Sequence, residues 1–409
     1  MPNDALPRLR GDRTAQLLAD AYHFVGTHAD RLGADGFRTR IAGRPITCLR
    51  GADAARFFYE GGRFGRSGAI PAPTRRLLQD DGSVQALEGE AHLDRKQRFL
   101  AVLDAEGRRS MLEAFDEAWE HGRGRRSGRD VRIRDEAVSV LGDAVLAWAG
   151  VPRDQDEAGG VTAELESMFE HAGRFGPSNL VAQLRRGRTE RRARRWIERA
   201  RAGAADAGGP LAEVAAWTDE AGDPLPVAVA AVELLNLLRP TVAVADFLVY
   251  AALALAVRPS LREPVRSADG TAGAFATEVR RHAPFFPVIA GTAARAVEWR
   301  GHGFEQGAWV LLDLFGTNHD ARLWPEPQRF RPERFLEDGA APEHVVAQGA
   351  GAYAADHRCP GEPATQALVE RFAQRLAEET WAPAVPPDAR IRYGRIPALP
   401  RTPLVLRFA

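Results

Sequence analysis

The feature that most limits the fold is a long apolar stretch from residue 227 to residue 257, VAVAAVELLNLLRPTVAVADFLVYAALALAV. As one helix it would be about 45 Å long at 1.5 Å per residue. That length could cross a membrane, but five residues interrupt the apolar pattern: Glu233, Asn236, Arg239, Pro240 and Asp246. Charges at bilayer depth are costly, whereas a helix that is apolar all round is typical of the core of a large protein. The stretch therefore predicts a central core helix.

Arg239 and Pro240 are the most informative pair in this stretch. Pro240 has no amide hydrogen and its ring crowds the carbonyl of Asn236, so we expect a kink there. A guanidinium in apolar surroundings must pair with an acid or bind an anion. Two interpretations stay open: a salt bridge to Glu233 or Asp246, or a bound anionic ligand.

Cys359 lies in a glycine-rich loop, residues 348–362, QGAGAYAADHRCPGE. Proline suits the first turn of a helix, so a helix over residues 363–381 should follow, with Cys359 at its N-terminus, where the macrodipole favours a thiolate. The small residues 349–351 allow the backbone to pass close to a flat group. A single thiolate here suits one axial ligand of a haem iron. The alternatives are a buried inert thiol and a nucleophilic cysteine paired with a histidine.

Length and composition narrow the class of protein. The chain has 409 residues without a Ser/Gly- or Pro-rich linker, so we expect a single domain over residues 1–409. Lys plus Arg and Asp plus Glu both number 55, so no net charge points to nucleic acid or to an anionic membrane. Two cysteines cannot make a disulfide framework, and the first twelve residues hold no apolar signal segment. We therefore expect a cytoplasmic protein without a membrane anchor.

Shorter segments carry local predictions. Residues 13–32 predict an amphipathic helix, and residues 37–41 and 45–49 predict two strands joined by a turn at Gly43. Cys48, in the second strand, is interpreted as a small buried hydrophobe. His92 and Lys96 share a helical face, which suits either an anionic group or an ordinary solvated surface.

A densely basic segment, residues 185–201, could bind nucleic acid. Its apolar residues, however, fall on one helical face: Leu184, Trp196, Ile197 and Ala200. Because the chain is neutral overall, a solvated helix with the arginines on its outer face is the preferred interpretation.

Four landmarks in order give the chain a resemblance to the cytochrome P-450 superfamily. They are the string LRPTVAVA at 238–245, the pair Glu278 and Arg281, the string PERF at 332–335, and HRCPGE at 357–362. The last string, with Gln348 and Gly349 upstream, and the first resemble the fatty-acid peroxygenase branch. One departure is Asp356, where the branch's pattern has glycine.

The resemblance implies a mainly α fold with a small β portion. Haem b would lie between the long central helix and the cysteine-ligand loop, with Cys359 as the thiolate ligand of the iron. The residues implied to contact the haem propionates are Arg66, His92, Lys96, Arg295 and His357. Glu278, Arg281 and Arg334 would form a buried ionic triad that positions the cysteine loop.

The resemblance also implies a reaction. In reductase-dependent relatives the kink usually carries an acid and an alcohol that relay protons to dioxygen, and neither Arg239 nor Pro240 can deliver a proton. The implied activity is therefore hydroxylation of a fatty acid by hydrogen peroxide at the alpha (or beta) carbon. Arg239 would bind the substrate carboxylate, which acts as acid and base.

The remaining expectations concern the channel and the partners. Gln85 would lie near the distal face of the haem, and Phe286 and Val288 would line an apolar channel. We expect no obligatory redox partner. The nearest alternative is oxidative decarboxylation to a terminal alkene by the same site. More distant alternatives are a reductase-dependent monooxygenase and a non-catalytic haem sensor or carrier.

Overall fold

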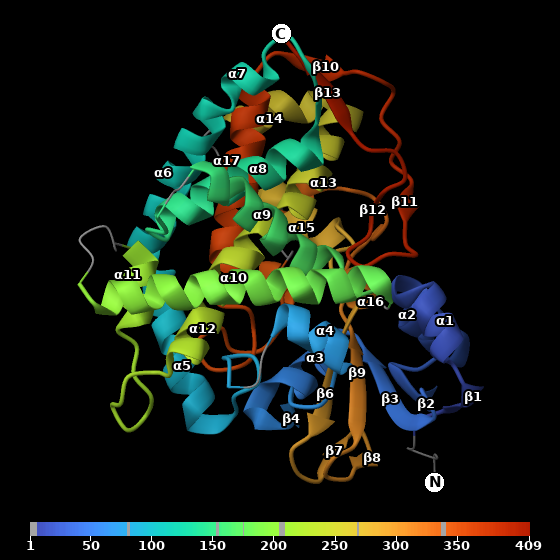
Figure 1. Ribbon diagram of the computed structural model, residues 1–409. Coiled ribbons are helices and arrows are strands. Elements are labelled where there is room, and N and C mark those ends of the chain that lie inside the picture. The colour runs from blue at the N-terminus through green and yellow to red at the C-terminus, as the bar shows by residue number, and fades with distance from the viewer. Residues whose placement is uncertain are drawn as a thin grey trace.

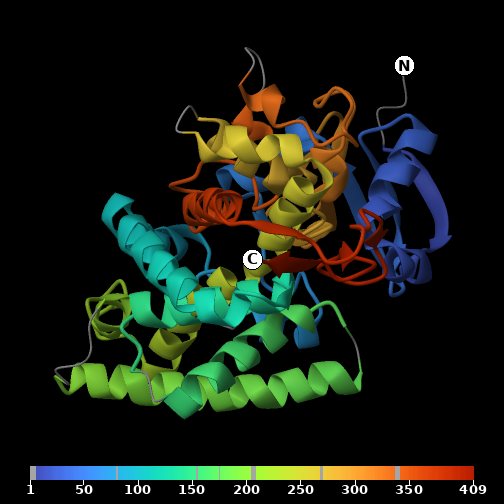
Figure 2. The same cartoon turned by 90° about the horizontal axis from the view of Figure 1, so that it is seen from above.

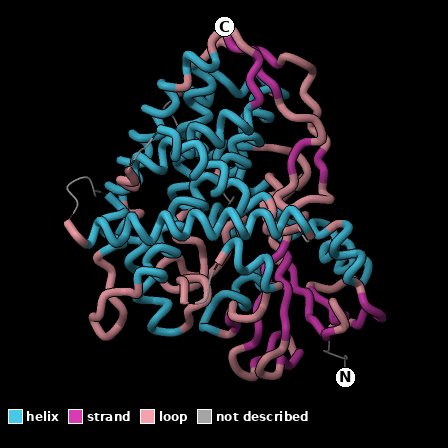
Figure 3. Tube along the Cα trace, viewed as in Figure 1, coloured by secondary structure: helices cyan, strands magenta, loops and turns pink. Residues whose placement is uncertain are grey.

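Helices make up most of the computed structural model, and strands gather in two small regions (Figure 1 and Figure 3). The structure describes residues 6–79, 82–152, 155–174, 176–203, 209–267, 270–336 and 341–409. This architecture confirms the predicted fold class, while the single domain stays a prediction. The α-helices are α1 (Thr14–Ala19), α2 (Ala21–Leu32), α3 (Ala52–Tyr59), α4 (Ala72–Leu78), α5 (Gly89–Val102), α6 (Ala105–His121), α7 (Arg123–Arg126), α8 (Ile133–Trp148), α9 (Gln155–Glu170), α10 (Pro177–Arg201), α11 (Gly209–Ala215), α12 (Val227–Ala243), α13 (Ala245–Val257), α14 (Arg262–Arg266), α15 (Thr271–His282), α16 (Phe315–Asn318) and α17 (Glu362–Glu378).

The larger β region is a six-stranded mixed sheet in the order β1-β2-β3-β9-β6-β4. The predicted hairpin is confirmed as β2 and β3, which pair antiparallel and end at Ile41 opposite Arg44. Ala42 and Gly43 between them have φ of 50° and 73°, as a two-residue hairpin turn requires. The bounds of this sheet are β1 (Arg8–Asp12), β2 (Gly36–Ile41), β3 (Arg44–Arg50), β4 (Phe64–Gly65), β6 (Val288–Ala293) and β9 (Trp309–Asp313).

Three smaller sheets complete the described strands. The strands are β5 (Asp130–Arg132), β10 (Trp381–Pro383) and β13 (Val405–Phe408) in one sheet, β11 (Ile391–Arg392) with β12 (Leu399–Pro400), and β7 (Val297–Trp299) with β8 (His302–Phe304). Cys48 in β3 is fully buried, which confirms its interpretation as a small core residue.

The helix expected over residues 13–32 is two helices, α1 and α2, which meet at Asp20. Asp20 has φ −152° and ψ 84°, and its carboxylate accepts a hydrogen bond from the backbone N–H of His23. An aspartate with this geometry caps a new helix, so the capping interaction ends α1 and begins α2.

The apolar stretch forms two consecutive helices, α12 and α13, separated at Val244. Pro240, where a kink was expected, lies inside α12, and the kink stays a prediction. At the break the N–H of Val244 bonds to the Thr241 carbonyl, three residues before it, as in a tightened last helical turn.

The core position predicted for this stretch is confirmed. Every residue from 230 to 253 except Pro240 is buried. By length and composition residues 227–257 could cross a membrane, but 78% of the most apolar window is buried inside the protein, as in a core helix. Helix α10 crosses the outside of this helical region (Figure 1 and Figure 2), with Trp196 and Ile197 buried and Arg194 and Arg195 exposed.

Candidate functional site

The cysteine loop ends where α17 begins. The backbone N–H of Cys359 donates to the Gln348 carbonyl at 3.0 Å, and the Cys359 carbonyl accepts from the N–H of Glu362 at 3.2 Å. The helix starts with a proline in its first turn, as expected. It ends at Glu378 rather than at residue 381, because Trp381 belongs to β10.

Two glycines let the loop pass close to other parts of the protein. A Cβ on Gly349 (φ +106°) would lie 3.0 Å from the Tyr59 hydroxyl, and one on Gly351 (φ +81°) would lie 2.4 Å from Asp356 Oδ2. That oxygen accepts a hydrogen bond from the N–H of Ala352 at 2.7 Å. Gly349 thus lets the loop pass against the Tyr59 ring, and Asp356 shapes the turn of the loop.

The N–H of Gly361 at the start of α17 lowers the pKa of the Cys359 thiol, as expected at a helix N-terminus. Burial raises its pKa, and this outweighs the lowering by the Gly361 N–H, Lys96 and Arg280. An unliganded thiolate is therefore unfavourable here, whereas coordination to a metal ion deprotonates a thiol. This environment suits a metal ligand better than a free nucleophile.

His357 of the cysteine loop packs against His92 of α5, with the two rings tilted by 35°. The ring centroids of His92 and His357 are 3.9 Å apart, and His357 Nε2 lies 3.3 Å from Glu88 Oε2. The other oxygen of Glu88 accepts from the backbone N–H of Arg66 at 2.9 Å. His357 is thus engaged with Glu88, and among the described residues no hydrogen bond joins a histidine to Cys359.

Lys96 joins this group, whereas Arg295 does not. The ammonium of Lys96 donates to the carbonyls of Asp356 and Arg358, the latter at 2.8 Å, and so holds the cysteine loop. Arg295 is exposed, and its described hydrogen bond goes to the Gly61 carbonyl at 3.3 Å. No described contact links Arg295 to the other predicted propionate residues.

The electrostatics of the cluster fit an anionic group. Burial lowers the pKa of His92 to about 3 and that of Lys96 to about 8, and also lowers the pKa of Arg66. Nη2 of Arg66 is buried without a hydrogen-bond partner among the described residues. His92 and Lys96 are 5% and 1% exposed, so the solvated-surface alternative is wrong. Buried donors of this kind suit the propionates of a haem.

Arg239 lies in α12 with one side of its guanidinium uncommitted. Nη2 donates to the Leu78 carbonyl and, at 2.8 Å, to Asn236 Oδ1. Nη1 is buried without a partner among the described residues, and the residue is 3% exposed. Burial and, second, the nearby Arg186 lower the pKa of Arg239 to about 9. A bound anion would offset both contributions, because its charge stabilises the guanidinium cation.

The internal salt bridge considered for Arg239 is wrong. Glu233 pairs with Arg95 at 2.5 Å and Asp246 pairs with Arg134 at 3.0 Å. Both candidate acids in the central helices are therefore engaged elsewhere. Of the two interpretations of Arg239, a bound anionic ligand is the one that remains.

Gln85 and Pro240 lie close to this guanidinium. Gln85 Oε1 accepts hydrogen bonds from Asn236 Nδ2 at 3.2 Å and from the Ser83 hydroxyl at 2.9 Å. Pro240 is exposed although its neighbours on both sides are buried. Asn236 links Arg239 to Gln85 through its side chain, and that these residues and Pro240 form one site stays a prediction.

Phe286 and Val288 keep apolar surface uncovered, as a channel lining requires. Both are partly exposed, and Phe286 packs edge-on against Phe285 with ring centroids 4.7 Å apart. Phe285 in turn stacks on Phe247 of α13 at 4.5 Å. Whether these residues contact a substrate stays a prediction.

The expected ionic triad is present and fully buried. Arg281 Nε donates to Glu278 at 2.7 Å and Arg334 Nε donates to the same carboxylate at 3.1 Å. Arg281 also reaches the carbonyl of Asn318 at 2.7 Å, and the side chain of Asn318 accepts from the N–H of Val346 at 2.9 Å. The triad is thereby tied to the segment that leads into the cysteine loop.

Sequence reasoning missed a second ionic group beside the triad. Arg280 pairs with Glu362 at 2.5 Å and donates to Gln348 Oε1 at 3.0 Å, and Arg358 donates to Glu362 at 2.6 Å. The local signals were the adjacency of Arg280 to Arg281 and the four-residue spacing of Arg358 and Glu362. Asn236, Arg95 and Tyr59 were likewise not assigned to the site.

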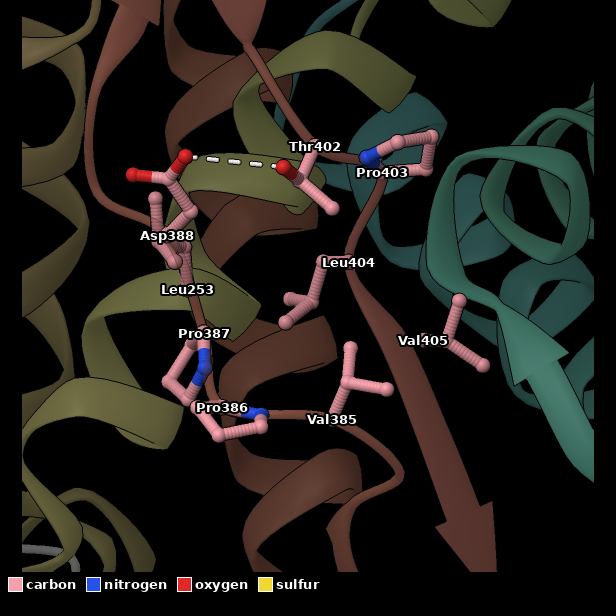
Figure 4. A pocket seen from close by; sticks show the side chains of 9 residues that line it. All are labelled: Leu253, Val385, Pro386, Pro387, Asp388, Thr402, Pro403, Leu404 and Val405. Carbon is pink, nitrogen blue, oxygen red and sulfur yellow. Dashed lines mark hydrogen bonds between the residues drawn. The ribbon is translucent and has the colours of Figure 1, made fainter.

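A surface groove lies apart from these residues. It is lined by residues of α13 and of the C-terminal segments, and Thr402 donates to Asp388 across it at 3.4 Å (Figure 4). Its lining contains none of the predicted site residues. Within the described ranges no group of three or more His, Cys, Asp or Glu side chains is placed to hold a bare metal ion.

Comparisons with known proteins agree with this geometry. The cytochrome P-450 family model matches residues 273–365. A variant of cytochrome P-450SP alpha (CYP152B1) is 39% identical with a TM-score of 0.92, and covers 97% of this chain and 98% of its own. Cytochrome P-450EX alpha (CYP152N1) with myristic acid is 34% identical with a TM-score of 0.93, at 98% of both chains. A variant of cytochrome P-450 OleT in complex with arachidonic acid is 28% identical with a TM-score of 0.93, also at 98% of both chains.

Curated sequences match over a shorter span. Cytochrome P-450 1A2 of Oryctolagus cuniculus is 35% identical over 139 residues, 31% of this chain and 26% of that protein, so the match spans about a quarter of the relative's length. The fold and the cysteine site define a haem-thiolate protein. The chain belongs to the cytochrome P-450 family, and its likeness along nearly its full length is to CYP152 members. The family's cofactor, haem b with a cysteine ligand, follows from this membership.

Proposed function

We propose that this protein is a peroxygenase that uses hydrogen peroxide to hydroxylate fatty acids at the alpha (or beta) carbon. Two of the CYP152 structures that it resembles contain a fatty acid, myristic or arachidonic acid. Cys359 is the proposed thiolate ligand, because the other cysteine, Cys48, lies fully buried within β3. Arg66, His92, Lys96 and His357 would hold the propionates, and Arg295 is the weakest of the five candidates.

The observation that carries this proposal is the free nitrogen of Arg239. This guanidinium is buried, its Nη1 has no partner among the described residues, and no described salt bridge joins it to an acid, so it is suited to receive a carboxylate, which guanidinium binds with paired hydrogen bonds. We propose that the bound molecule lies against the exposed Pro240 next to it. A fatty acid supplies the carboxylate and an apolar chain for Phe286 and Val288.

The haem, Arg239 and the substrate carboxylate have different roles in the proposed reaction. When bound, the haem supplies the oxidising chemistry for which hydrogen peroxide is consumed. Arg239 fixes the substrate carboxylate in a site that excludes water, where electrostatic contacts are strong. The carboxylate oxygen that faces the peroxide can take a proton from one peroxide oxygen and return it to the other. The substrate thereby provides the acid–base group that Arg239 and Pro240 lack.

The use of peroxide also determines which partners the enzyme needs. Hydrogen peroxide already carries the two electrons that a reductase would otherwise deliver to dioxygen, so we propose that no redox partner is obligatory. We place the enzyme in the cytoplasm, where two unpaired cysteines stay reduced.

The test is product analysis with a series of fatty acids of different chain length and hydrogen peroxide, without any reductase. We expect mainly 2- or 3-hydroxy acids. Product that forms only with a reductase and NADPH would refute the peroxygenase proposal, and mainly terminal alkene would replace hydroxylation by decarboxylation.

A further inference from the structure

Asn236 connects the two side chains that the proposed function places at the substrate carboxylate. Its Oδ1 accepts from Arg239 Nη2 at 2.8 Å, and its Nδ2 lies 3.2 Å from Gln85 Oε1. The same Nδ2 donates to Glu233 Oε2 at 2.8 Å. Asn236 is 7% exposed, so these three contacts occur within the protein interior.

The chemistry of its neighbours leaves Asn236 one orientation. A guanidinium can only donate, so Arg239 must face the amide oxygen. An ionised carboxylate can only accept, so Glu233 must face the amide nitrogen. Rotating the amide by 180° would set donor against donor and acceptor against acceptor.

Glu233 holds the Asn236 amide in this orientation. It is fully buried, and its other oxygen accepts from Arg95 Nη1 at 2.5 Å and from the backbone N–H of Val84 at 3.0 Å. All three partners of the carboxylate are donors, which keeps it in the role of acceptor. Arg95 forms the described salt bridge with Glu233, and in the described hydrogen bonds Arg239 reaches this carboxylate only through Asn236.

The orientation of the Asn236 amide also determines the orientation of the Gln85 amide. Since Nδ2 of Asn236 donates, the atom of Gln85 that it meets must be the carbonyl oxygen, which also faces the Ser83 hydroxyl. The Nε2 group of Gln85 therefore points away from both. Among the described residues it has no hydrogen-bond partner, and it is available as a second donor beside Arg239.

We propose that Asn236 is a positioning residue that turns Arg239 and Gln85 so that both present N–H donors to the substrate carboxylate. Glu233, held by Arg95, sets the direction of this hydrogen-bond chain. The inference rests on the proposed function and adds to it the residue that controls carboxylate recognition. It assigns Asn236 no contact with the reacting atoms.

The test compares myristic acid with its methyl ester, which has the same chain but no carboxylate. Dissociation constants are measured from the change in haem absorbance of the loaded protein. The wild-type protein should bind the acid more tightly than the ester. In Asn236→Ala this preference should fall by about tenfold or more, the usual effect of losing a hydrogen bond to a charged group, while ester binding stays unchanged.

Two further variants sharpen the comparison. Asn236→Asp keeps the size of the side chain but puts a carboxylate beside Arg239 and removes the donor to Gln85, so the acid should bind more weakly than in Asn236→Ala. Thr241→Val is the matched control on the same helix, because the one hydrogen bond of its hydroxyl to the described residues goes to the Leu237 carbonyl. It should keep the full preference for the acid.

The possible results distinguish failure of the proposed function from failure of the positioning role of Asn236. If the wild-type protein shows no preference for the acid, the proposed function is wrong and this inference falls with it. If the wild-type protein prefers the acid and both Asn236 variants keep that preference, only the positioning role is refuted. An equal loss of acid and ester binding in the variants would also refute it, since it would indicate a general packing defect.

Discussion

Arg239→Ala should abolish recognition of the substrate carboxylate. The guanidinium is 3% exposed, and the nitrogen that would face the ligand has no partner among the described residues. Removing one member of such a desolvated pair costs about 2–5 kcal/mol, or roughly 30-fold to several thousand-fold in affinity. Arg239→Lys should rescue poorly. The two terminal nitrogens have separate tasks, one holding Leu78 and Asn236 and one facing the ligand, and lysine has a single nitrogen.

A substrate without a carboxylate gives the decisive assay. With hydrogen peroxide, the wild-type protein should oxidise it only when a short carboxylic acid is added to occupy Arg239, and Arg239→Ala should stay inactive with or without the acid. Rates are measured over a range of acid concentrations at fixed peroxide. Equal turnover with and without the acid in the wild-type protein would show that the carboxylate is not the proton carrier.

Three other predictions concern the iron ligand, the product and pH. Cys359→Ala should lose the carbon-monoxide absorption band of a thiolate-ligated haem, and a variant that kept this band would exclude Cys359 as the ligand. Gln85→His should raise the ratio of alkene to hydroxy acid, measured by gas chromatography at matched peroxide, because a histidine can exchange a proton near neutral pH and a glutamine cannot; an unchanged ratio would remove Gln85 as the determinant. The haem-free protein should lose stability as pH falls from about 6.5 towards 3, since the pKa of His92 is about 3 when folded and 6.5 ordinarily, so the unfolded chain binds the extra proton. Thermal unfolding across this window should show a smaller slope for His92→Gln and for the haem-loaded protein, and equal slopes in all three would argue against a titrating His92.

Much of the site could be predicted because its signals are local in the sequence. The hairpin is marked by Gly43, the start of α17 by the prolines around the cysteine loop, and the triad by Glu278 and Arg281 in one helical turn. The apolar stretch was placed in the core because charges interrupt it. In each case neighbouring residues or a helical period carry the information.

What the sequence did not reveal depends on contacts between residues far apart in the chain. The partner of Glu233 is Arg95, which lies 138 residues earlier in the chain. This ion pair could therefore not be predicted from the sequence of the central helix alone. The pKa of Cys359 follows from burial, which depends on packing by the whole chain. Arg295, which the resemblance implied as a propionate contact, is exposed, and its contact with a propionate stays a prediction.

Helix α5 links the two sides of the site through consecutive residues. Arg95 holds Glu233 of the central helix, and Lys96 holds the carbonyls of Asp356 and Arg358 in the cysteine loop. Adjacent residues on a helix point about 100° apart, so the spacing between the central helix and the loop is set by one rigid turn. A single inserted or deleted residue before Arg95 would turn both side chains away together. Segments joining these elements can therefore change length during evolution, whereas the register of α5 cannot.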